Sequence, residues 1–147
     1  MKYSIAVDFD GVIHSYQSGW TTSAEVLDPP TLGAFEWLEE MVKHFHVYIY
    51  SARFTLHQGV LEGFEGNKTR LDVENAKLAV TFWFRENGMP LEVLEKLEFW
   101  TGAGKPTALV YIDDRGYRFT GDNFPTKGEI HRLLPWCKGA FIPDEED

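Results

Sequence analysis

The chain has little cysteine and no long hydrophobic run. Its 147 residues include a single cysteine, Cys137, so an internal disulfide framework is excluded. No apolar stretch approaches the length of a membrane span, and the N-terminal residues enter an apolar strand pattern without the basic and small-residue features of a secretory signal. We therefore expect a cytoplasmic protein without a membrane partner.

Positive charge is also scarce. Lysine and arginine together number 14 against 23 aspartates and glutamates, which gives a formal net charge of -9. Non-specific nucleic-acid binding depends on neutralising phosphates with Lys and Arg, so we expect no extended nucleic-acid binding surface. A nucleotide or the end of a nucleic-acid strand is still possible as a substrate.

The length and composition are those of one compact domain. Hydrophobic residues make up 44% of the chain and aromatic residues 15%, which is enough to build a core. No internal repeat, low-complexity segment or linker divides the sequence. We predict one domain over residues 1–142, followed by an acidic tail at 143–147.

The most informative feature present is Asp8-Phe9-Asp10-Gly11, which follows the apolar run 3–7. Alternate side chains of a strand point to the same side, so Asp8 and Asp10 can enter one crevice while Phe9 points into the core. Gly11 allows a sharp backbone turn past a bound anion. Taken alone, the pattern also fits a solvated acidic turn.

Two more apolar strands, predicted over 46–50 and 108–112, end in polar groups. They are followed by Ser51 and Arg53 in the first case, and by Asp113, Asp114 and Arg115 in the second. In an open parallel α/β sheet the ligand crevice lies beyond the carboxyl ends of the strands. A carboxylate pair at the end of a buried strand is costly without a cation or hydrogen-bond donors nearby.

Two helices are predicted between these strands. The first covers 31–43, capped by Thr31, with Leu32, Phe35, Leu38 and Val42 on one face. The second covers 68–87 and is stopped by Gly88. Its apolar residues occupy more than one side, so we expect it to be well buried; they are Val73, Leu78, Val80, Phe82 and Phe84.

The remaining segments give weaker signals. Residues 91–94 read as a helical turn, and 97–100 are ambiguous but compatible with a strand. We expect an edge strand over 117–120 and a final helix in which Thr126 and Glu129 have capping-box spacing. The alternation of strands and helices predicts an α/β fold of three layers, a Rossmann-like and mostly parallel sheet with helices on both faces.

The ordered motifs resemble those of the haloacid dehalogenase-like (HAD) superfamily of phosphotransferases. They are Asp8 to Gly11, Ser51 after a strand, Lys105-Pro106, and Asp113-Asp114, and the resemblance spans residues 3 to 115. Within the superfamily the chain is similar to small proteins of phages and bacteria. The intervals 14–28 and 55–104 are too short for a large folded cap, so we expect minimal or no cap, with loops 15–23 and 55–66 as possible shields.

The resemblance implies a mechanism and a cofactor. Asp8 would be the nucleophile that forms an aspartyl phosphate, and Asp10 the general acid and base. Ser51 would donate a hydrogen bond to a phosphoryl oxygen, and Lys105 would supply a fixed positive charge. Mg²⁺ would be held by the Asp8 carboxylate, the Asp10 main-chain carbonyl, Asp113 and Asp114, the last directly or through water.

Other residues are weaker candidates. Arg53, Arg115 and Gly11 are candidate substrate-binding residues, although surface salt bridges are the favoured interpretation of the two arginines. Ser51 and Lys105 also fit a simple strand end and an ordinary loop. His14 and His57 lie in loops near the expected mouth of the site, where substrate contact is the less favoured interpretation.

The predicted function is Mg²⁺-dependent hydrolysis of a phosphomonoester. A phosphorylated small molecule or a nucleic-acid end is the expected partner, with nucleotides favoured by the similarity of the segment 112–115 to that of deoxyribonucleotidases. The alternative is a phosphate-binding or partner-binding protein with little turnover. A phosphotransferase or mutase is disfavoured because it needs a cap to exclude water.

Overall fold

The computed structural model describes residues 2–55, 69–102 and 104–133. The chain divides into two compact units, residues 1–112 and 113–147. A single domain over 1–142 therefore stays a prediction. His57, most of the loop 55–66, Cys137 and the acidic tail lie outside the described residues.

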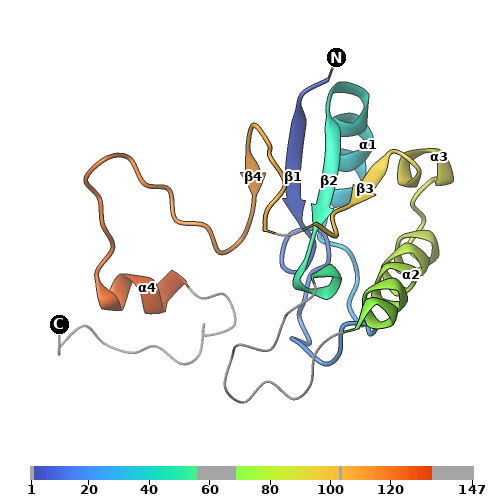
Figure 1. Cartoon of the computed structure of the whole chain (residues 1–147), viewed down its shortest axis with the longest axis horizontal. Helices are drawn as coiled ribbons and strands as arrows, with labels where there is room; N and C mark the ends of the chain where they lie inside the picture. The colour runs from blue at the N-terminus through green and yellow to red at the C-terminus, as the bar shows by residue number, and fades with distance from the viewer. Residues whose placement is uncertain (1, 56–68, 103, 134–147) are drawn as a thin grey trace. The chain divides into compact units, whose positions relative to one another are not determined.

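The first unit is built on a parallel sheet (Figure 1). Its four strands are β1 (Ser4–Asp8), β2 (His46–Tyr50), β3 (Leu97–Phe99) and β4 (Tyr111–Ile112), in the spatial order β3-β2-β1-β4. Every pairing in it is parallel. The α/β class and the parallel sheet are thus confirmed. The last strand is shorter than predicted, although Leu109 and Val110 already hydrogen-bond to β1.

One face of the sheet carries the core. Ile5 pairs with Val47 and Val7 with Ile49, and all four side chains are at most 3% exposed. Both long helices, α1 (Ala34–His44) and α2 (Arg70–Glu86), contribute to the same hydrophobic cluster. Since the ring of Phe35 in α1 contacts Trp83 and Phe84 in α2, the two helices share this face. Helices on the opposite face stay a prediction.

Helix α1 begins later than predicted. Its N-cap is Gly33 in a left-handed conformation (φ 83°), without a side-chain capping bond, so the prediction of a Thr31 cap was wrong. The N–H of Thr31 instead donates to the carbonyl of Ile13 at 2.8 Å, which ties this residue into the preceding loop. Leu32 is fully exposed, whereas Leu38 and Val42 are buried as expected.

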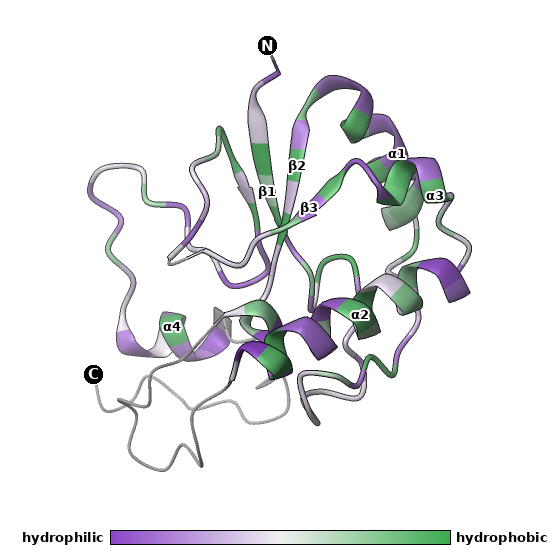
Figure 2. Ribbon diagram, turned by 45° about the vertical axis from the view of Figure 1, so that its right-hand side comes forward, coloured by the Kyte–Doolittle hydropathy of each residue, from purple (hydrophilic) through white to green (hydrophobic). Residues whose placement is uncertain are grey.

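Helix α2 has the predicted extent to within two residues at each end. Thr69 caps it in a capping box with Asp72, and Gly88 follows its end with φ 94°. The prediction that α2 is buried on more than one side was wrong, because Leu78 and Phe82 are 67% and 64% exposed. Hydrophobic and hydrophilic residues alternate along this helix (Figure 2). A helix that packs on one face of a sheet buries only one stripe.

The ambiguous segment after α2 contains both expected elements. Residues Leu91–Leu94 form the short helix α3, and β3 follows and pairs with β2. A single 3-10 turn, η1 (Ala52–Phe54), follows β2. No helix in the described part of the chain is long and apolar enough to cross a membrane.

The described part of the second unit contains one helix, α4 (Lys127–Leu133). The Thr126 hydroxyl accepts the N–H of Glu129 at 3.2 Å, as the capping-box spacing predicted. The prediction of an edge strand over 117–120 was wrong, because these residues form no strand. The Asn123 side chain instead accepts the N–H of Thr120 and donates to the carbonyl of Arg118. These bonds turn the backbone locally, which satisfies its polar groups without a neighbouring strand.

Candidate active site

Strand order reverses at β1. The chain passes from β1 to β2 and β3 on one side of it and then returns to β4 on the other side. In parallel α/β sheets ligands bind beyond the carboxyl ends of the strands at such a switch point. Asp8 is the last residue of β1 and is half-buried, so its carboxylate lies at this position.

A tight turn follows Asp8. Phe9 is fully buried in the core, as predicted, and its carbonyl accepts the N–H groups of Ile13 and His14 at 3.0 and 2.9 Å. Gly11 has φ 89°, a conformation that favours glycine, and its N–H donates to the carbonyl of His14. The turn therefore directs Phe9 inward and folds the chain back over its ring.

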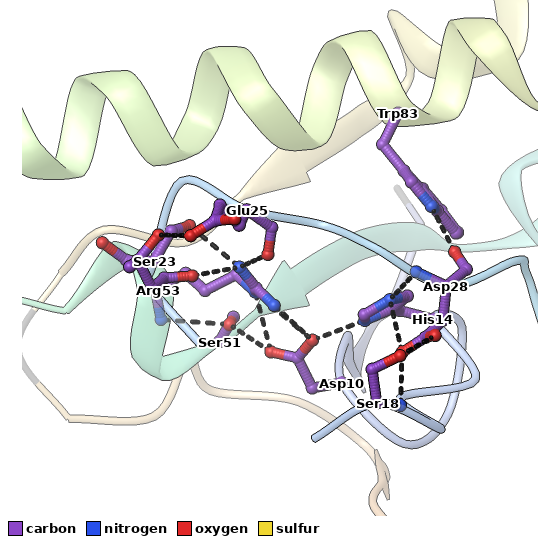
Figure 3. A network of polar contacts seen from close by, with 10 residues as sticks. Asp10, His14, Ser18, Ser23, Glu25, Asp28, Ser51, Arg53 and Trp83 are labelled. Atoms are coloured by element: carbon purple, nitrogen blue, oxygen red, sulfur yellow. Dashed lines mark hydrogen bonds and ion pairs between the residues drawn. The ribbon is translucent and has the colours of Figure 1, made fainter. Parts of the chain in front are cut away.

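The carboxylate of Asp10 is held from several directions (Figure 3). Arg53 donates from Nε to Oδ2 at 2.9 Å and from Nη2 to Oδ1 at 3.1 Å. Nδ1 of His14 lies 2.8 Å from Oδ1, and the Ser51 hydroxyl donates to Oδ2 over a longer 3.4 Å. The side chain of Asp10 is only 12% exposed. Asp10 is thus part of a buried polar network.

This network sets the protonation state of Asp10. Burial raises the pKa of its carboxyl, but hydrogen bonds from His14 and Arg53 and the positive charge of Arg53 outweigh burial, so the pKa lies below its usual range. Asp10 is therefore ionised at neutral pH in the free protein.

Arg53 lies inside the protein. Its side chain is 1% exposed, so the alternative of a surface salt bridge was wrong: the ion pair exists, but it is buried. Nη1 donates to the carbonyls of Thr22, Ser23 and Glu25 at 3.1, 2.9 and 2.8 Å. The guanidinium also lies over the rings of Phe9 and Trp20.

His14 is buried as well, although the sequence placed it in a loop at the mouth of the site. It is 1% exposed and stacks on the ring of Phe9. Its Nε2 accepts the backbone N–H of Asp28 at 3.1 Å, which leaves the ring proton on Nδ1, where it donates to Asp10.

Sequence reasoning missed Asp28 and Trp83, which extend the network. The Asp28 carboxylate accepts the N–H and hydroxyl of Ser18 at 2.8 and 2.6 Å, and the Asp28 carbonyl accepts the indole N–H of Trp83 at 2.8 Å. Although burial raises the pKa of Asp28, the hydrogen bonds from Ser18 lower it below the usual range. The only local signal at Asp28 is the following Pro29, which favours an extended backbone for the residue before it. This signal does not indicate that the Asp28 side chain is buried.

Ser51 and Lys105 occupy different surroundings. Ser51 follows β2, is 5% exposed, and its hydroxyl oxygen accepts the N–H of Arg53 at 3.1 Å. Lys105 is exposed, with its ammonium 5.8 and 5.2 Å from the ring centres of Tyr50 and Tyr111. Ser51 thus contacts Asp10, and Lys105 lies near the last residue of β2 and the first residue of β4.

Asp113, Asp114 and Arg115 follow β4 and begin the second unit. Ile112 pairs with Val7, so the chain leaves β4 at the sheet edge where β1 ends in Asp8. Within the second unit the Asp113 carboxylate accepts the N–H of Arg115 at 2.7 Å.

Comparisons with protein-family models, with curated proteins and with solved structures gave no match to this chain. The resemblance to the HAD superfamily therefore stays a hypothesis carried by the motifs. Inferences about activity depend on the residues themselves.

Proposed function

We propose that the protein is a Mg²⁺-dependent phosphomonoester hydrolase of the HAD type, with Asp8 as nucleophile. The observation that carries this proposal is the position of Asp8 at the carboxyl end of the strand where the sheet order reverses. Ser51, at the end of the neighbouring strand, supplies a hydroxyl close to the same edge. Covalent catalysis by a carboxylate divides one difficult displacement into two easier ones.

The proposed cofactor site consists of oxygen ligands only. The carboxylates of Asp8, Asp113 and Asp114 and the main-chain carbonyl of Asp10 are hard donors, and this donor set fits Mg²⁺. When bound, the ion would neutralise negative charge on a phosphoryl group. Asp113 and Asp114 belong to this proposed set because the motif resemblance assigns them to it.

The chain's own groups then have separate tasks. In the proposed reaction an Asp8 oxygen bonds to phosphorus as the bond from phosphorus to the leaving oxygen breaks, and Ser51 and Lys105 bind phosphoryl oxygens. The ionised carboxylate of Asp10 is suited to take a proton from the water that attacks the intermediate. To protonate the leaving group in the first step, Asp10 must gain a proton when substrate binds.

The same carboxylate gives the second candidate function its support. A buried carboxylate that is paired with Arg53 and His14 resists protonation, which disfavours acid catalysis. We therefore retain the alternative of a phosphate-binding or partner-binding protein with little turnover. As substrates we favour nucleotides or nucleic-acid ends, and cytoplasmic location stays part of the proposal.

The test is a screen of nucleoside monophosphates, phosphorylated oligonucleotides, sugar phosphates and aryl phosphates with Mg²⁺. We expect turnover by the wild type, loss with a chelator, recovery with added Mg²⁺, and no reaction above background for Asp8→Asn. Glu39→Gln, which neutralises an exposed carboxylate on α1, is the matched control and should be fully active. Equal residual rates in the wild type and Asp8→Asn would instead support the binding protein.

The role of Asp10 is tested by the leaving group. Asp10→Asn should lower the rate for an alkyl phosphate by about 10²- to 10⁴-fold, as expected for lost acid-base catalysis. An aryl phosphate should lose less, because its leaving group is stable as an anion, and phosphate should accumulate on Asp8. Rapid acid quench followed by peptide mass spectrometry would detect that adduct. Equal losses for both esters without an adduct would remove Asp10 from the acid-base role.

A further inference from the structure

The surroundings of Arg53 leave it little access to a substrate. Its side chain is 1% exposed, and all three guanidinium nitrogens donate to acceptors of the protein. The ring centres of Phe9 and Trp20 lie 5.9 and 5.1 Å from the Cζ atom of Arg53. A substrate phosphate would have to displace Asp10 or the loop carbonyls to reach it. This placement favours a role within the protein over the substrate contact predicted from the sequence.

One end of the guanidinium organises a loop. The carbonyls of Thr22, Ser23 and Glu25 converge on Nη1 within 3.1 Å. Backbone carbonyls that point into a protein need donors, and here one side chain supplies them to three residues. The conformation of this segment therefore depends on Arg53.

The other end of the guanidinium fixes Asp10. Nε donates to Oδ2 at 2.9 Å and, over a longer 3.3 Å, to Oδ1, which also accepts from Nη2 at 3.1 Å. Because both carboxylate oxygens are bound by one planar group, the plane of the carboxylate is set as well as its position. His14, four residues after Asp10 in the same turn, donates to Oδ1. A group that must move a proton needs this kind of fixed orientation.

We propose that Arg53 is a positioning residue that orients the Asp10 carboxylate and fastens residues 22–25 beside it. The kinetic consequence rests on the proposed hydrolase function, whereas the fastening of the loop does not. Residues 22–25 then have one fixed conformation. The conformation of this segment and the orientation of the Asp10 carboxylate both depend on the side chain of Arg53.

Hydrogen-exchange mass spectrometry tests the loop directly. Arg53→Lys keeps the charge but lacks the planar group that reaches Asp10 and three carbonyls together. We expect peptides covering 20–28 to exchange at least ~10-fold faster in this variant, with α1 unchanged. The matched control is Arg85→Lys, because Arg85 also donates from Nη1 to a carbonyl, that of Met89. Wild-type exchange rates in a folded Arg53→Lys variant would overturn the proposal.

A measurement on the wild type covers the case in which Arg53→Lys does not fold. In nitrogen-15 NMR spectra the Nε–H of Arg53 should exchange slowly with water, since it is buried against Asp10. That of exposed Arg85 should exchange fast. Equal, fast exchange of both groups would contradict the fixed contact.

Steady-state kinetics separate positioning from substrate binding. Arg53→Lys should lower kcat by at least ~10-fold while KM changes by less than ~2-fold, because the interaction lost is with Asp10. A raised KM with unchanged kcat would show that Arg53 contacts the substrate and would overturn the proposal. If the wild type hydrolyses no phosphoester, the proposed function fails, and the exchange experiments still decide the role of Arg53.

Discussion

The segment that follows β1 and the segment that precedes β4 are stabilised in different ways. Residues 10–33, which follow β1, bury charged and polar side chains, and Arg53 reaches into them from the end of β2. In the described residues of 100–110, which precede β4, Lys105 is exposed over two tyrosine rings and Trp100 donates its indole N–H to Gly104 near the surface. The first segment is specified by buried hydrogen bonds, and the second by exposed contacts.

This difference predicts which side chains the fold needs. A buried polar group that loses its partner retains the full cost of its removal from water, whereas an exposed group finds water instead. Substitutions after β1 should therefore affect folding as well as any activity. Substitutions of exposed side chains before β4 should affect folding little, and Lys105→Ala should lower activity in the proposed reaction.

The largest difference is expected between Arg53→Ala and Lys105→Ala. Removing Arg53 leaves the buried carboxylate of Asp10 with a lost ion pair, and should lower the free energy of unfolding by about 3–5 kcal/mol. Removing Lys105 takes away an exposed ammonium and its contacts with the rings of Tyr50 and Tyr111, which should cost at most about 1 kcal/mol. Urea unfolding followed by circular dichroism measures both. Similar losses in the two variants would contradict the comparison.

Two tryptophans that each donate an indole hydrogen bond allow a closer comparison of the two segments. Trp83 donates its indole N–H to the buried carbonyl of Asp28 at 2.8 Å, and Trp100 donates to the exposed Gly104 carbonyl at 2.9 Å. Trp83→Phe should cost about 1–3 kcal/mol, because the buried carbonyl of Asp28 loses the donor that Trp83 supplies. Trp100→Phe should change the free energy of unfolding by less than about 0.5 kcal/mol. If the Trp100 variant is the less stable one, burial does not govern these segments.

The smallest effect is expected from acid. The pKa values of Asp10 and Asp28 are depressed below 3.8 in the folded protein. Their contribution to stability is therefore present above the unfolded value near 3.8 and is lost as the pH falls through the folded pKa values. Carbon-13 NMR titration of the carboxyl groups, combined with urea unfolding between pH 2 and 6, would test this. Titration of Asp10 at or above the ordinary value would show that Arg53 and His14 do not hold it ionised.

Much of the first unit was predictable from local patterns. The apolar strands β1 and β2 and the capped helix α2 follow from strand runs and from start and stop signals that act within a few residues. The start of α1 was not predictable in this way. The backbone of Thr31 pairs with Ile13, a contact across 18 positions (31 minus 13) that no local signal contains.

The candidate site shows the same division. Its aspartates were identified because they stand at the ends of apolar strands, and the structure places Asp8 at the reversal of strand order. Whether Arg53 faces solvent or Asp10 could not be read from its residue type, since both environments suit a guanidinium. Burial of His14 depended on the ring of Trp83 in α2, which is distant in the sequence, as well as on the ring of nearby Phe9.

By itself, the sequence determined the class of fold and the position of the acidic motif in it, because periodicity and turn residues act locally on the backbone. The tertiary structure alone decided which polar groups are buried together. Asp10, Arg53, His14 and Asp28 meet only after the strands have paired and α2 has packed on the sheet. Removing charged groups from water is favourable only with all partners in place, so the folded chain as a whole fixes that arrangement.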